Sequence, residues 1–546
     1  MNEDFRPLAG AVRQEIERAI GAEHLCTTPE DLDRYSRCTI PWRSRCAAVV
    51  FPDGSAQVSA LLRICGAHRI PVWPYSTGRN WGYGTTLATE DGAVIMILSR
   101  MNRVLEVNEE LAYAVIEPGV TYEGLNAYLK SHGHRLWVDC IDGTAQGSVI
   151  GNALDRGIGE TPYGDHFGNL CGLEVVLPDG GILRTGGPEG STSWNVHKWG
   201  VGPYLEGIFS QSNYGVVTRA GIWLMPRPQA YNSYVFEIRD EACLPPVLDA
   251  FRGLALSGVV NTKLHMINDF VSLTILTQRI HEAVPQKGPL GESDRAALRR
   301  KYGIAPWNCA GGIYGTRAQV RLQRALLRKA LSPYGRLLFV SDWQIPHIER
   351  LIAWSWKHPL LRRLTEVGAR TSLPVLESAP HVHRILQGIP TDFFVRHAYY
   401  RCRRPRPPGA VEPARDGCGL TWFAPILPFS NAQVWPYLEA CRMRFAAHGF
   451  DFYIAMLLMN PRAVVCLMAI LYDREDGEET EHARLLYSEL LSDARARRIR
   501  PYRAGLESWP TLYADAPQLH EACERIKAAL DPEGILAPGR YGIGAA

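Results

Sequence analysis

The sequence predicts an α/β or α+β fold, and three observations indicate it. Short runs of β-forming residues alternate with amphipathic helical segments through the first half of the chain. The stretch 139–221 is dense in glycine and contains a hairpin pattern at Asp179-Gly180. After about Pro228 glycine becomes rarer and longer helical patterns begin, so a second structural unit is expected there.

The elements of the first half follow from their local patterns. The run AAVVFP predicts a strand over 47–52, and a turn at Asp53-Gly54 leads into a helix over 55–69 with one apolar face. Four more strands are expected after it, at 70–75, 93–98, 103–107 and 113–117. A helix is expected at 121–133.

The second half is expected to hold longer helices, among them 293–302 and 317–331. The Pro- and Arg-rich segment 401–413 is expected to be a solvated basic loop. The tail 500–546 is again punctuated by Gly and Pro, and we expect it to pack back on the first unit.

Composition excludes several functional classes. The 546 residues include 59 Lys+Arg and 56 Asp+Glu, and the formal net charge is +3, which excludes a dedicated nucleic-acid binder. With 46% hydrophobic residues the chain is neither disordered nor collagen-like. Its 14 Trp, 23 Tyr and 15 Phe suit a pocket for a flat molecule.

The chain is expected to be cytoplasmic and to have no membrane span. It has no run of about 18 apolar residues, and its first residues lack the basic start and apolar run of a secretion signal. The 13 Cys are scattered without a Cys-x-x-Cys pair, which favours reduced thiols and excludes a zinc ribbon. No metal site is expected.

Three glycine-rich loops follow strands of the first half, at 74–84 (PYSTGRNWGYG), 142–166 and 211–226. Glycines allow backbone N–H groups to converge on an anion, so such loops can cradle a pyrophosphate. The phosphate loop of Walker-type ATPases, the dinucleotide-binding Gly-x-Gly-x-x-Gly, His-Glu-x-x-His and Gly-x-Ser-x-Gly motifs are all missing. Ligand binding through these loops is therefore the hypothesis that the residues favour.

An ordered set of motifs spans nearly the whole chain: PYSTGRNWGYG, EPGVTYEGL, GNALDRGIGETPYGDH, QSNYGVVTRAGIWLMP, GLTWFAPI, PYRAGL and DPEGILAPGRYGI. Together these motifs resemble the vanillyl-alcohol oxidase / p-cresol methylhydroxylase family of flavoproteins. The resemblance implies an α+β protein with a two-subdomain FAD-binding domain of the methylhydroxylase type and a central α+β cap domain with an antiparallel sheet. The implied boundaries are 1–228 for the FAD-binding domain, 229–499 for the cap, and 500–546 for a segment that returns to the first domain.

The resemblance also implies the FAD contacts. The pyrophosphate would lie on the first loop, and further contacts would come from the other two loops and the tail. The implied residues are Ser76, Thr77, Gly78, Arg79, Asn80, Trp81, Gly147, Ser148, Asn152, Gly215, Val217 and Arg540.

Four residues match the family's catalytic positions. Tyr83, Tyr502 and Arg503 match two tyrosines and an arginine that grip a phenol oxygen. The arginine keeps its positive charge, and the two tyrosines supply O–H donors. Together they favour the phenolate through charge-assisted hydrogen bonds. The phenolate pushes electrons toward its para substituent, so a hydride can leave that carbon for the flavin N5 and give a p-quinone methide. Asp155 matches an aspartate near N5 that stabilises charge or activates water.

The flavin linkage departs from the family pattern. A histidyl tether would stand five residues before Pro425, where this chain has Leu420, so a histidyl linkage is not expected. Tyr399 and Tyr400 are the candidates for a tyrosyl tether, and non-covalent FAD stays open. The expected pocket residues are largely apolar, so they favour a substrate with an apolar para chain or a large ring. They are Trp422, Ala455, Leu457, Val464, Cys466 and Met468.

The sequence therefore predicts an FAD-dependent oxidoreductase for para-substituted phenols, completed by water addition or proton loss. Molecular oxygen, a cytochrome or another electron acceptor would reoxidise it, and a homo-oligomer such as a dimer is expected from the family. Two alternatives stay open. One is an FAD enzyme for a non-phenolic alcohol or hydroxy acid, and the other is a non-catalytic FAD-binding protein.

Overall fold

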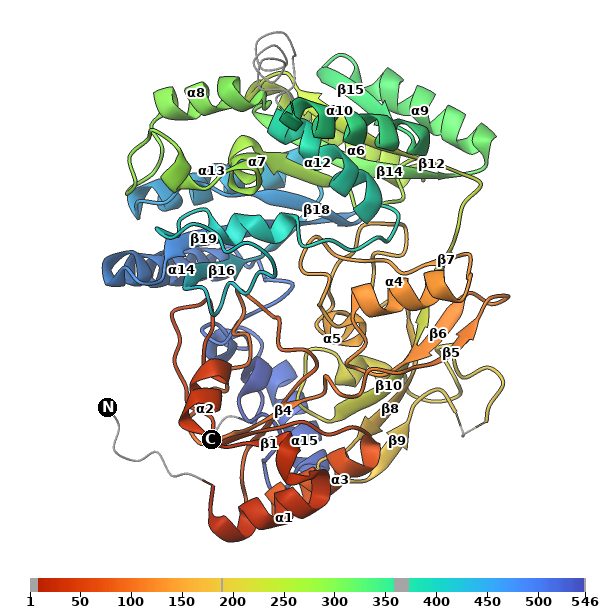
Figure 1. The fold of residues 1–546 in the computed structure, drawn as a ribbon, viewed down its shortest axis with the longest axis vertical. Helices are drawn as coiled ribbons and strands as arrows, with labels where there is room; N and C mark the ends of the chain where they lie inside the picture. The colour runs from red at the N-terminus through yellow and green to blue at the C-terminus, as the bar shows by residue number, and fades with distance from the viewer. Residues whose placement is uncertain (1–7, 188–189, 358–372, 545–546) are drawn as a thin grey trace.

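The computed structural model describes residues 8–187, 190–357 and 373–544. Figure 1 shows two units, one above the other. The lower unit contains the N-terminal part of the chain, drawn in red to yellow, together with the blue C-terminal tail. The upper unit contains the central part, from green to blue.

The first sheet of the lower unit has the strand order β1-β2-β4-β3, with β2, β4 and β3 parallel. Apolar faces of two helices pack on it, because Val12 and Ile16 of one and Val58 and Leu61 of the other share a core with the strands. The elements are α1 (Gly10–Ile20), β1 (Leu25–Cys26), α2 (Pro29–Tyr35), β2 (Ala48–Val50), α3 (Ser55–Ala67), β3 (Val72–Tyr75) and β4 (Val94–Ile97).

The second sheet is antiparallel, with the order β5-β6-β10-β8-β9. The predicted hairpin is present, since β8 pairs with β9 across the turn at Asp179-Gly180, and Gly180 has a φ of +81° that suits glycine. The elements are β5 (Val104–Asn108), β6 (Tyr113–Ile116), α4 (Tyr122–Ser131), β7 (Leu136–Trp137), α5 (Val149–Leu154), β8 (Leu170–Val176), β9 (Ile182–Arg184), β10 (Val216–Trp223) and β11 (Met225–Pro226).

The upper unit is built on an eight-stranded sheet with the order β15-β12-β14-β13-β18-β19-β16, and β17 pairs with β19 off this path. Its strands are β12 (Ala230–Ile238), β13 (His265–Asn268), β14 (Trp307–Gly315), β15 (Gly335–Val340), β16 (Cys418–Phe423), β17 (Ile426–Pro428), β18 (Ala455–Asn460) and β19 (Ala463–Asp473). All the pairings of this sheet are antiparallel.

Helices cover one face of this sheet, and apolar residues of α6, α9, α13 and α14 form a continuous core with it. The other face looks toward the lower unit and carries a smaller cluster. The helices are α6 (Leu244–Leu256), α7 (Asp269–Leu276), α8 (Glu292–Tyr302), α9 (Arg317–Leu331), α10 (Ile345–Lys357), α12 (Leu373–Ile385), the 3-10 helix η6 (Phe394–Tyr399), α13 (Asn431–Ala447) and α14 (Gly477–Ala496).

The tail returns to the lower unit, as Figure 1 shows. After α15 (Pro517–Leu530), Leu536 forms a parallel bridge with Val72 of β3, and the Ala537 N–H donates to the Val72 carbonyl at 2.8 Å. Earlier in the tail, Pro501 bridges Pro425 of the upper sheet. The tail therefore contacts both units, and its two halves are fixed by different sheets.

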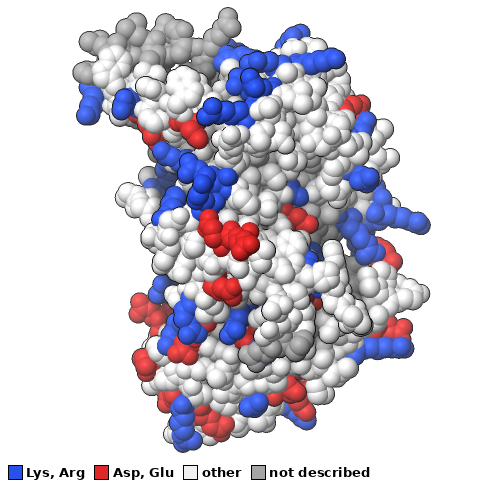
Figure 2. Space-filling view, turned by 90° about the vertical axis from the view of Figure 1, so that its right-hand side faces the viewer, with Lys and Arg blue, Asp and Glu red and all other residues white. Residues whose placement is uncertain are grey.

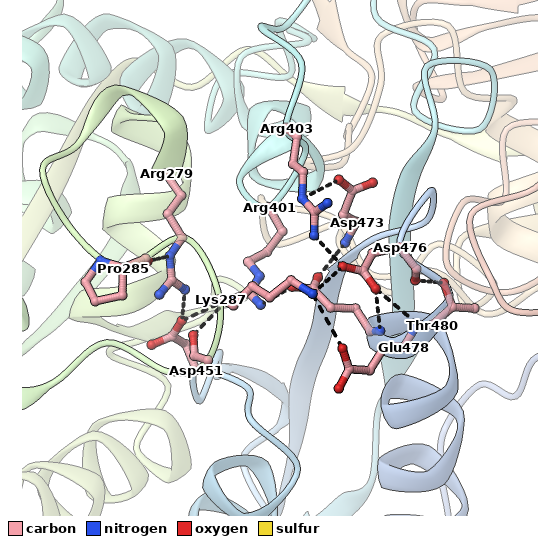
Figure 3. A network of polar contacts seen from close by, with 12 residues as sticks. Arg279, Pro285, Lys287, Arg401, Arg403, Asp451, Asp473, Asp476, Glu478 and Thr480 are labelled. Carbon is pink, nitrogen blue, oxygen red and sulfur yellow. Dashed lines mark hydrogen bonds and ion pairs between the residues drawn. The ribbon is translucent and has the colours of Figure 1, made fainter.

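The Arg-rich segment 401–413 forms no helix or strand and is mostly exposed, which agrees with the predicted basic loop, but its arginines also pair with acidic residues. Arg401 is buried and donates to Glu479 at 2.7 Å, and Arg403 bonds Asp476 next to Lys287 (Figure 3). Asp476 also caps α14 by accepting from the Glu478 N–H at 3.0 Å. The network fixes the segment to the N-terminus of α14.

The predicted helices and strands between residues 47 and 133 are confirmed, with differences at their ends. The helices expected at 293–302 and 317–331 are α8 and α9. In the described part of the chain, every helix is too short or too polar to cross a membrane. On the face in Figure 2, basic and acidic side chains are interspersed, which agrees with the near-neutral net charge.

Candidate active site

A cavity lies between the two units and is lined by residues of both. The lower unit contributes three loop regions, 74–83, 141–158 and 209–217, together with the tail. The upper unit contributes residues of η6, β16, β18 and β19. The three glycine-rich loops predicted to bind a ligand therefore converge on one space.

The first loop follows β3, and its Gly82 lies where the upper unit packs against the loop. Gly82 has a φ of +81°, and a Cβ there would lie 2.2 Å from Cδ1 of Trp422. The backbone N–H of Trp422 donates to the Gly82 carbonyl at 3.1 Å. Among the described residues, none accepts a hydrogen bond from the backbone N–H of Gly78, Arg79 or Asn80. These donors are available to an anionic ligand.

The second loop contains the short helix α5. The Ser148 side chain caps this helix by accepting from the Gly151 N–H at 2.9 Å. Gly151 permits close contact with the first loop, because a Cβ there would lie 2.2 Å from Oγ of Ser76. The packing of these two loops forms one side of the cavity.

The third loop holds the tail in place. The Asn213 amide donates to the carbonyls of Ala537 and Ile543 at 2.9 and 3.0 Å. This fixes Arg540, whose Nη1 donates to the Pro74 carbonyl at 3.1 Å. Its Nε is buried and has no partner in the described structure. An unpaired guanidinium nitrogen beside free backbone donors fits a dinucleotide such as FAD, with its phosphates on the loops.

The predicted cofactor residues are brought together, with two exceptions. Twelve line the cavity: Ser76, Thr77, Gly78, Arg79, Asn80, Trp81, Gly147, Ser148, Asn152, Gly215, Val217 and Arg540. Tyr399 and Tyr400 do not line it, and their role as tethering residues stays a prediction. The Tyr399 hydroxyl donates to Asp416, and Tyr400 packs edge-on against Phe270. They turn away because Ala398, one residue earlier on η6, occupies the wall.

Tyr83, Tyr502 and Arg503 are brought together on the cavity wall. The guanidinium carbon of Arg503 lies 5.3 Å from the ring centroid of Tyr83 and 5.6 Å from that of Tyr502. Arg503 Nε donates to the Asp155 carbonyl at 3.0 Å, whereas Nη2 is buried and has no partner in the described structure. Burial, and next the neighbouring Tyr502, raise the pKa of Tyr83 well above its usual range. Its hydroxyl therefore stays protonated and can donate.

Asp155 lies at the C-terminal end of α5 and also lines the cavity. One carboxylate oxygen accepts from the Tyr541 hydroxyl at 2.6 Å, and the other accepts from the Asn80 amide at 3.4 Å. Nη2 of Arg540 lies 3.8 Å from the first oxygen. These groups hold the Asp155 side chain in place on the cavity wall.

In the upper unit, the structure differs in part from the predicted set of pocket residues. Trp422, Ala455 and Leu457 line the cavity as predicted. Val464, Cys466 and Met468 belong to the core on the opposite face of the sheet, so their prediction as pocket residues is wrong. Side chains alternate along a strand, and Ala455 pairs with Leu467 whereas Met456 pairs with Cys466. The cavity-facing residue of β19 is therefore Leu467, one position from the expected ones.

Several polar residues that line the cavity were not predicted from the sequence. His397, Asp142 and Tyr453 line it from three different segments, and Gln211 links the Asp155 and Tyr502 carbonyls at 3.2 and 2.8 Å. No spacing pattern joins these residues. The only available signal was the position of Asp142 and Gln211 in two of the glycine-rich loops.

A buried ion pair joins the two units beside the cavity. His265 of β13 lies 2.9 Å from Glu160 of the lower unit. Burial raises the pKa of Glu160, and His265 counteracts this effect. Burial alone would lower the pKa of His265, but Glu160, with Asp142 and Asp139, raises it to about 9. His265 is therefore protonated at neutral pH.

Comparison with known proteins gives consistent matches. The family model described as "FAD binding domain" matches residues 46–186. The chain is 38% identical to 1'-carboxy-chondrochloren decarboxylase of Chondromyces crocatus, over 97% of both proteins. The crystal structure of p-cresol methylhydroxylase with substrate bound has a TM-score of 0.86 at 27% identity, covering 98% of this chain and 96% of that one. A 4-ethylphenol oxidase from Gulosibacter chungangensis, in an isoeugenol complex, has a TM-score of 0.85 at 28% identity, covering 98% and 97%.

Proposed function

The chain belongs to the vanillyl-alcohol oxidase / p-cresol methylhydroxylase family of FAD-linked oxidoreductases, and from this we propose that it oxidises para-substituted phenols. The FAD-binding domain and the antiparallel cap of that family are both present. The solved relatives named above include a p-cresol methylhydroxylase and a 4-ethylphenol oxidase. The proposal extends their substrate class to this chain.

One observation carries the proposal: the guanidinium group of Arg503, whose Nη2 has no partner among the described residues, lies near the rings of Tyr83 and Tyr502 on the cavity wall. A free phenol has a pKa near 10, and the fixed positive charge of Arg503 favours its anion. Tyr83 and Tyr502 would donate hydrogen bonds to the same oxygen. These three residues would hold the substrate as a phenolate, which makes its para carbon a hydride donor.

The Gly-rich loops and Arg540 would hold FAD, and bound FAD would supply the acceptor for that hydride. Asp155, held by hydrogen bonds from Tyr541 and Asn80, would stabilise positive charge that develops on the substrate side chain. Apolar Ala455, Leu457 and Leu467 would contact that side chain. They exclude water and favour an alkyl or aryl para group over a strongly polar one.

A spectroscopic experiment tests the proposal. Anaerobic addition of 4-ethylphenol to the FAD-loaded enzyme is expected to bleach the flavin, and 4-ethylanisole is expected to do so at least 100-fold more slowly, because its oxygen cannot ionise. Equal rates would contradict the phenolate mechanism and favour a non-phenolic substrate. A flavin that no phenol bleaches would favour a non-catalytic FAD-binding protein. Reoxidation by oxygen with release of hydrogen peroxide, or by a cytochrome, then identifies the acceptor.

A second candidate function is oxidative decarboxylation, favoured by the 38% identity to a decarboxylase over nearly the full chain. A quinone methide can accept the electrons of a neighbouring C–COO⁻ bond, so that carbon dioxide leaves and an alkene forms. We expect 3-(4-hydroxyphenyl)propanoate to give 4-vinylphenol if this function holds. Oxidation of 4-ethylphenol without any turnover of the carboxylated phenol would exclude it.

A further inference from the structure

His397 is a histidine of the cavity wall to which the proposed reaction assigns no role. It lies on η6, and its ring centroid is 5.5 Å from that of Trp422 and 5.8 Å from that of Tyr453. All three residues line the cavity that contains Tyr83, Tyr502 and Arg503. His397 comes from the upper unit, whereas these three residues come from the first loop and the tail.

The hydrogen bonds of His397 define its tautomer. Nδ1 lies 2.6 Å from the carbonyl oxygen of Phe394, and a carbonyl can only accept, so Nδ1 carries the hydrogen. Burial holds the pKa of His397 below its ordinary value, although the Phe394 carbonyl and Asp142 act in the opposite direction. The ring is therefore neutral near pH 7, with its basic lone pair on Nε2.

Nε2 is buried and has no hydrogen-bond partner among the residues that the structure describes. An unpaired buried acceptor costs about 1–3 kcal/mol, and such atoms are often satisfied by a ligand. The ionisable groups that face this ring are Asp142 from the second loop and Tyr453 from the segment before β18. Neither forms a hydrogen bond with it.

Asp155 is less suited to accept a proton. Its carboxylate already accepts hydrogen bonds from Tyr541 and Asn80, and Arg540 lies beside it. Its backbone is held as well, because its carbonyl accepts from Arg503 and Gln211. A water molecule that approached either carboxylate oxygen would compete with these donors. The neutral, unpaired Nε2 of His397 has no such competition.

We infer that His397 is the general base of the step that follows oxidation, which rests on the proposed phenol oxidation. Loss of a hydride leaves a p-quinone methide. When water attacks the para side-chain carbon, a C–O bond forms, the ring electrons return to the oxygen beside Arg503, and the proton of the water passes to Nε2. Where no water adds, Nε2 takes a proton from the neighbouring carbon, and those C–H electrons form an alkene.

The test separates oxidation from the step after it. FAD-loaded wild type, His397→Gln and His397→Gly are mixed anaerobically with 4-ethylphenol. Flavin bleaching reports oxidation, and quenched samples report 1-(4-hydroxyphenyl)ethanol and 4-vinylphenol. His381→Gln is the matched control, because His381 is a half-buried histidine of α12 that stacks on Phe393 and lies outside the cavity. Flavin content and melting temperature confirm that each variant is folded.

We expect His397→Gln and His397→Gly to bleach within about 3-fold of the wild-type rate but to form both products at least 10-fold more slowly. Added imidazole should accelerate product formation in His397→Gly, because it replaces the missing base. His381→Gln should match the wild type in both measurements. Unchanged product formation in His397→Gln, or no effect of imidazole on folded His397→Gly, would overturn the inference. Absence of bleaching in the wild type would instead overturn the proposed function, and the inference with it.

Discussion

At the scale of single residues, Arg503 is the group on which the proposed chemistry depends most. Its Nε is committed to the Asp155 carbonyl at 3.0 Å, and its Nη2 is unpaired in the described structure. The first contact fixes the plane of the guanidinium group, and the second leaves a donor for the substrate. An arginine can do both at once, whereas a lysine has a single ammonium group on a flexible stem.

Replacement of Arg503 should therefore slow flavin reduction. We expect Arg503→Ala to lower the anaerobic reduction rate with 4-ethylphenol by about 100-fold, or roughly 3 kcal/mol, because a charge-assisted contact to the phenolate is lost. Arg503→Lys should lie between this variant and the wild type, because it keeps the charge without the fixed plane. Stopped-flow absorbance measures the rates. Arg484→Lys is the control, since this half-exposed arginine pairs with Glu481 across one helix turn and does not line the cavity. A wild-type rate in Arg503→Ala would refute the anion-binding role.

The sequence located the residues of the site that belong to contiguous motifs. Tyr83 and Tyr502-Arg503 lie in separate motifs, and the structure brings them together. Val464, Cys466 and Met468 were misplaced because one residue of register moves a side chain to the other face of a strand. His397 was missed because its role depends on packing between segments, which local patterns do not describe.

At the scale of elements, the first Gly-rich loop and β16 fit together through one glycine. Gly82 lies in the left-handed region, its N–H donates to Thr39, and its carbonyl accepts from Trp422. The indole of Trp422 occupies the space that a Cβ would need. The loop that would hold FAD is therefore positioned by the sheet that would contact the substrate.

Gly82→Ala should weaken FAD binding and lower the melting temperature. The alanine would be strained at a φ of +81°, and its Cβ would lie 2.2 Å from Trp422, so Trp422 or the loop must move. The backbone strain alone costs about 1–3 kcal/mol. Titration of the apoprotein with FAD and a thermal scan measure the effects. Gly253→Ala in α6 is the control, because a Cβ there meets nothing within 4 Å. If Gly82→Ala binds FAD like Gly253→Ala, the loop does not depend on this contact.

Helices and strands with clear periodicity, such as α3, α9 and the strands from β2 to β6, could be predicted from the sequence because local pattern and burial agree there. The partners of the Arg-rich segment could not. Its predicted loop character is present, but its acidic partners Asp473, Asp476 and Glu479 lie about 70 residues further along the chain (Figure 3). Opposite charges distant in sequence are paired by the fold, which no local pattern reveals.

At the scale of the whole molecule, the two units are joined beside the cavity by the ion pair of His265 and Glu160. The folded pKa of His265 is about 9, above its ordinary value of about 6.5. The stabilisation by this pair is therefore complete below about pH 6.5 and is lost as the pH rises through about 9. Attachment of the cap to the FAD-binding unit should weaken over that range.

We expect His265→Gln to melt below the wild type at pH 6 and the difference to disappear by about pH 10. The free-energy gap at pH 6 should be on the order of 2 kcal/mol, because the charged pair is lost. Melting temperatures measured across this pH range provide the test. His24→Gln, at a contact between a partly buried histidine and the exposed Glu23, should show no such trend. A gap for His265→Gln that does not change with pH would show that the pair is not charged.

The state of the flavin is also a property of the whole molecule, because the cavity is closed by both units. Leu420 and Ala398 line it, and Tyr399 and Tyr400 are directed elsewhere. We therefore expect FAD to be bound non-covalently. Acid precipitation of the holoenzyme should leave the flavin in the supernatant. Flavin retained in the pellet would show a tether, and its peptide would identify the residue.

The central claim is that the cavity binds its substrate as a phenolate, and the ionisation of a bound phenol tests it most directly. 4-Nitrophenol cannot give a hydride from its para group, and its anion is yellow. Difference spectra with the FAD-loaded enzyme are recorded at a pH where the free phenol is mostly neutral. We predict that the anion band appears on binding to the wild type and not with Arg503→Ala. Binding of 4-nitrophenol in its neutral form to the wild type would contradict the account.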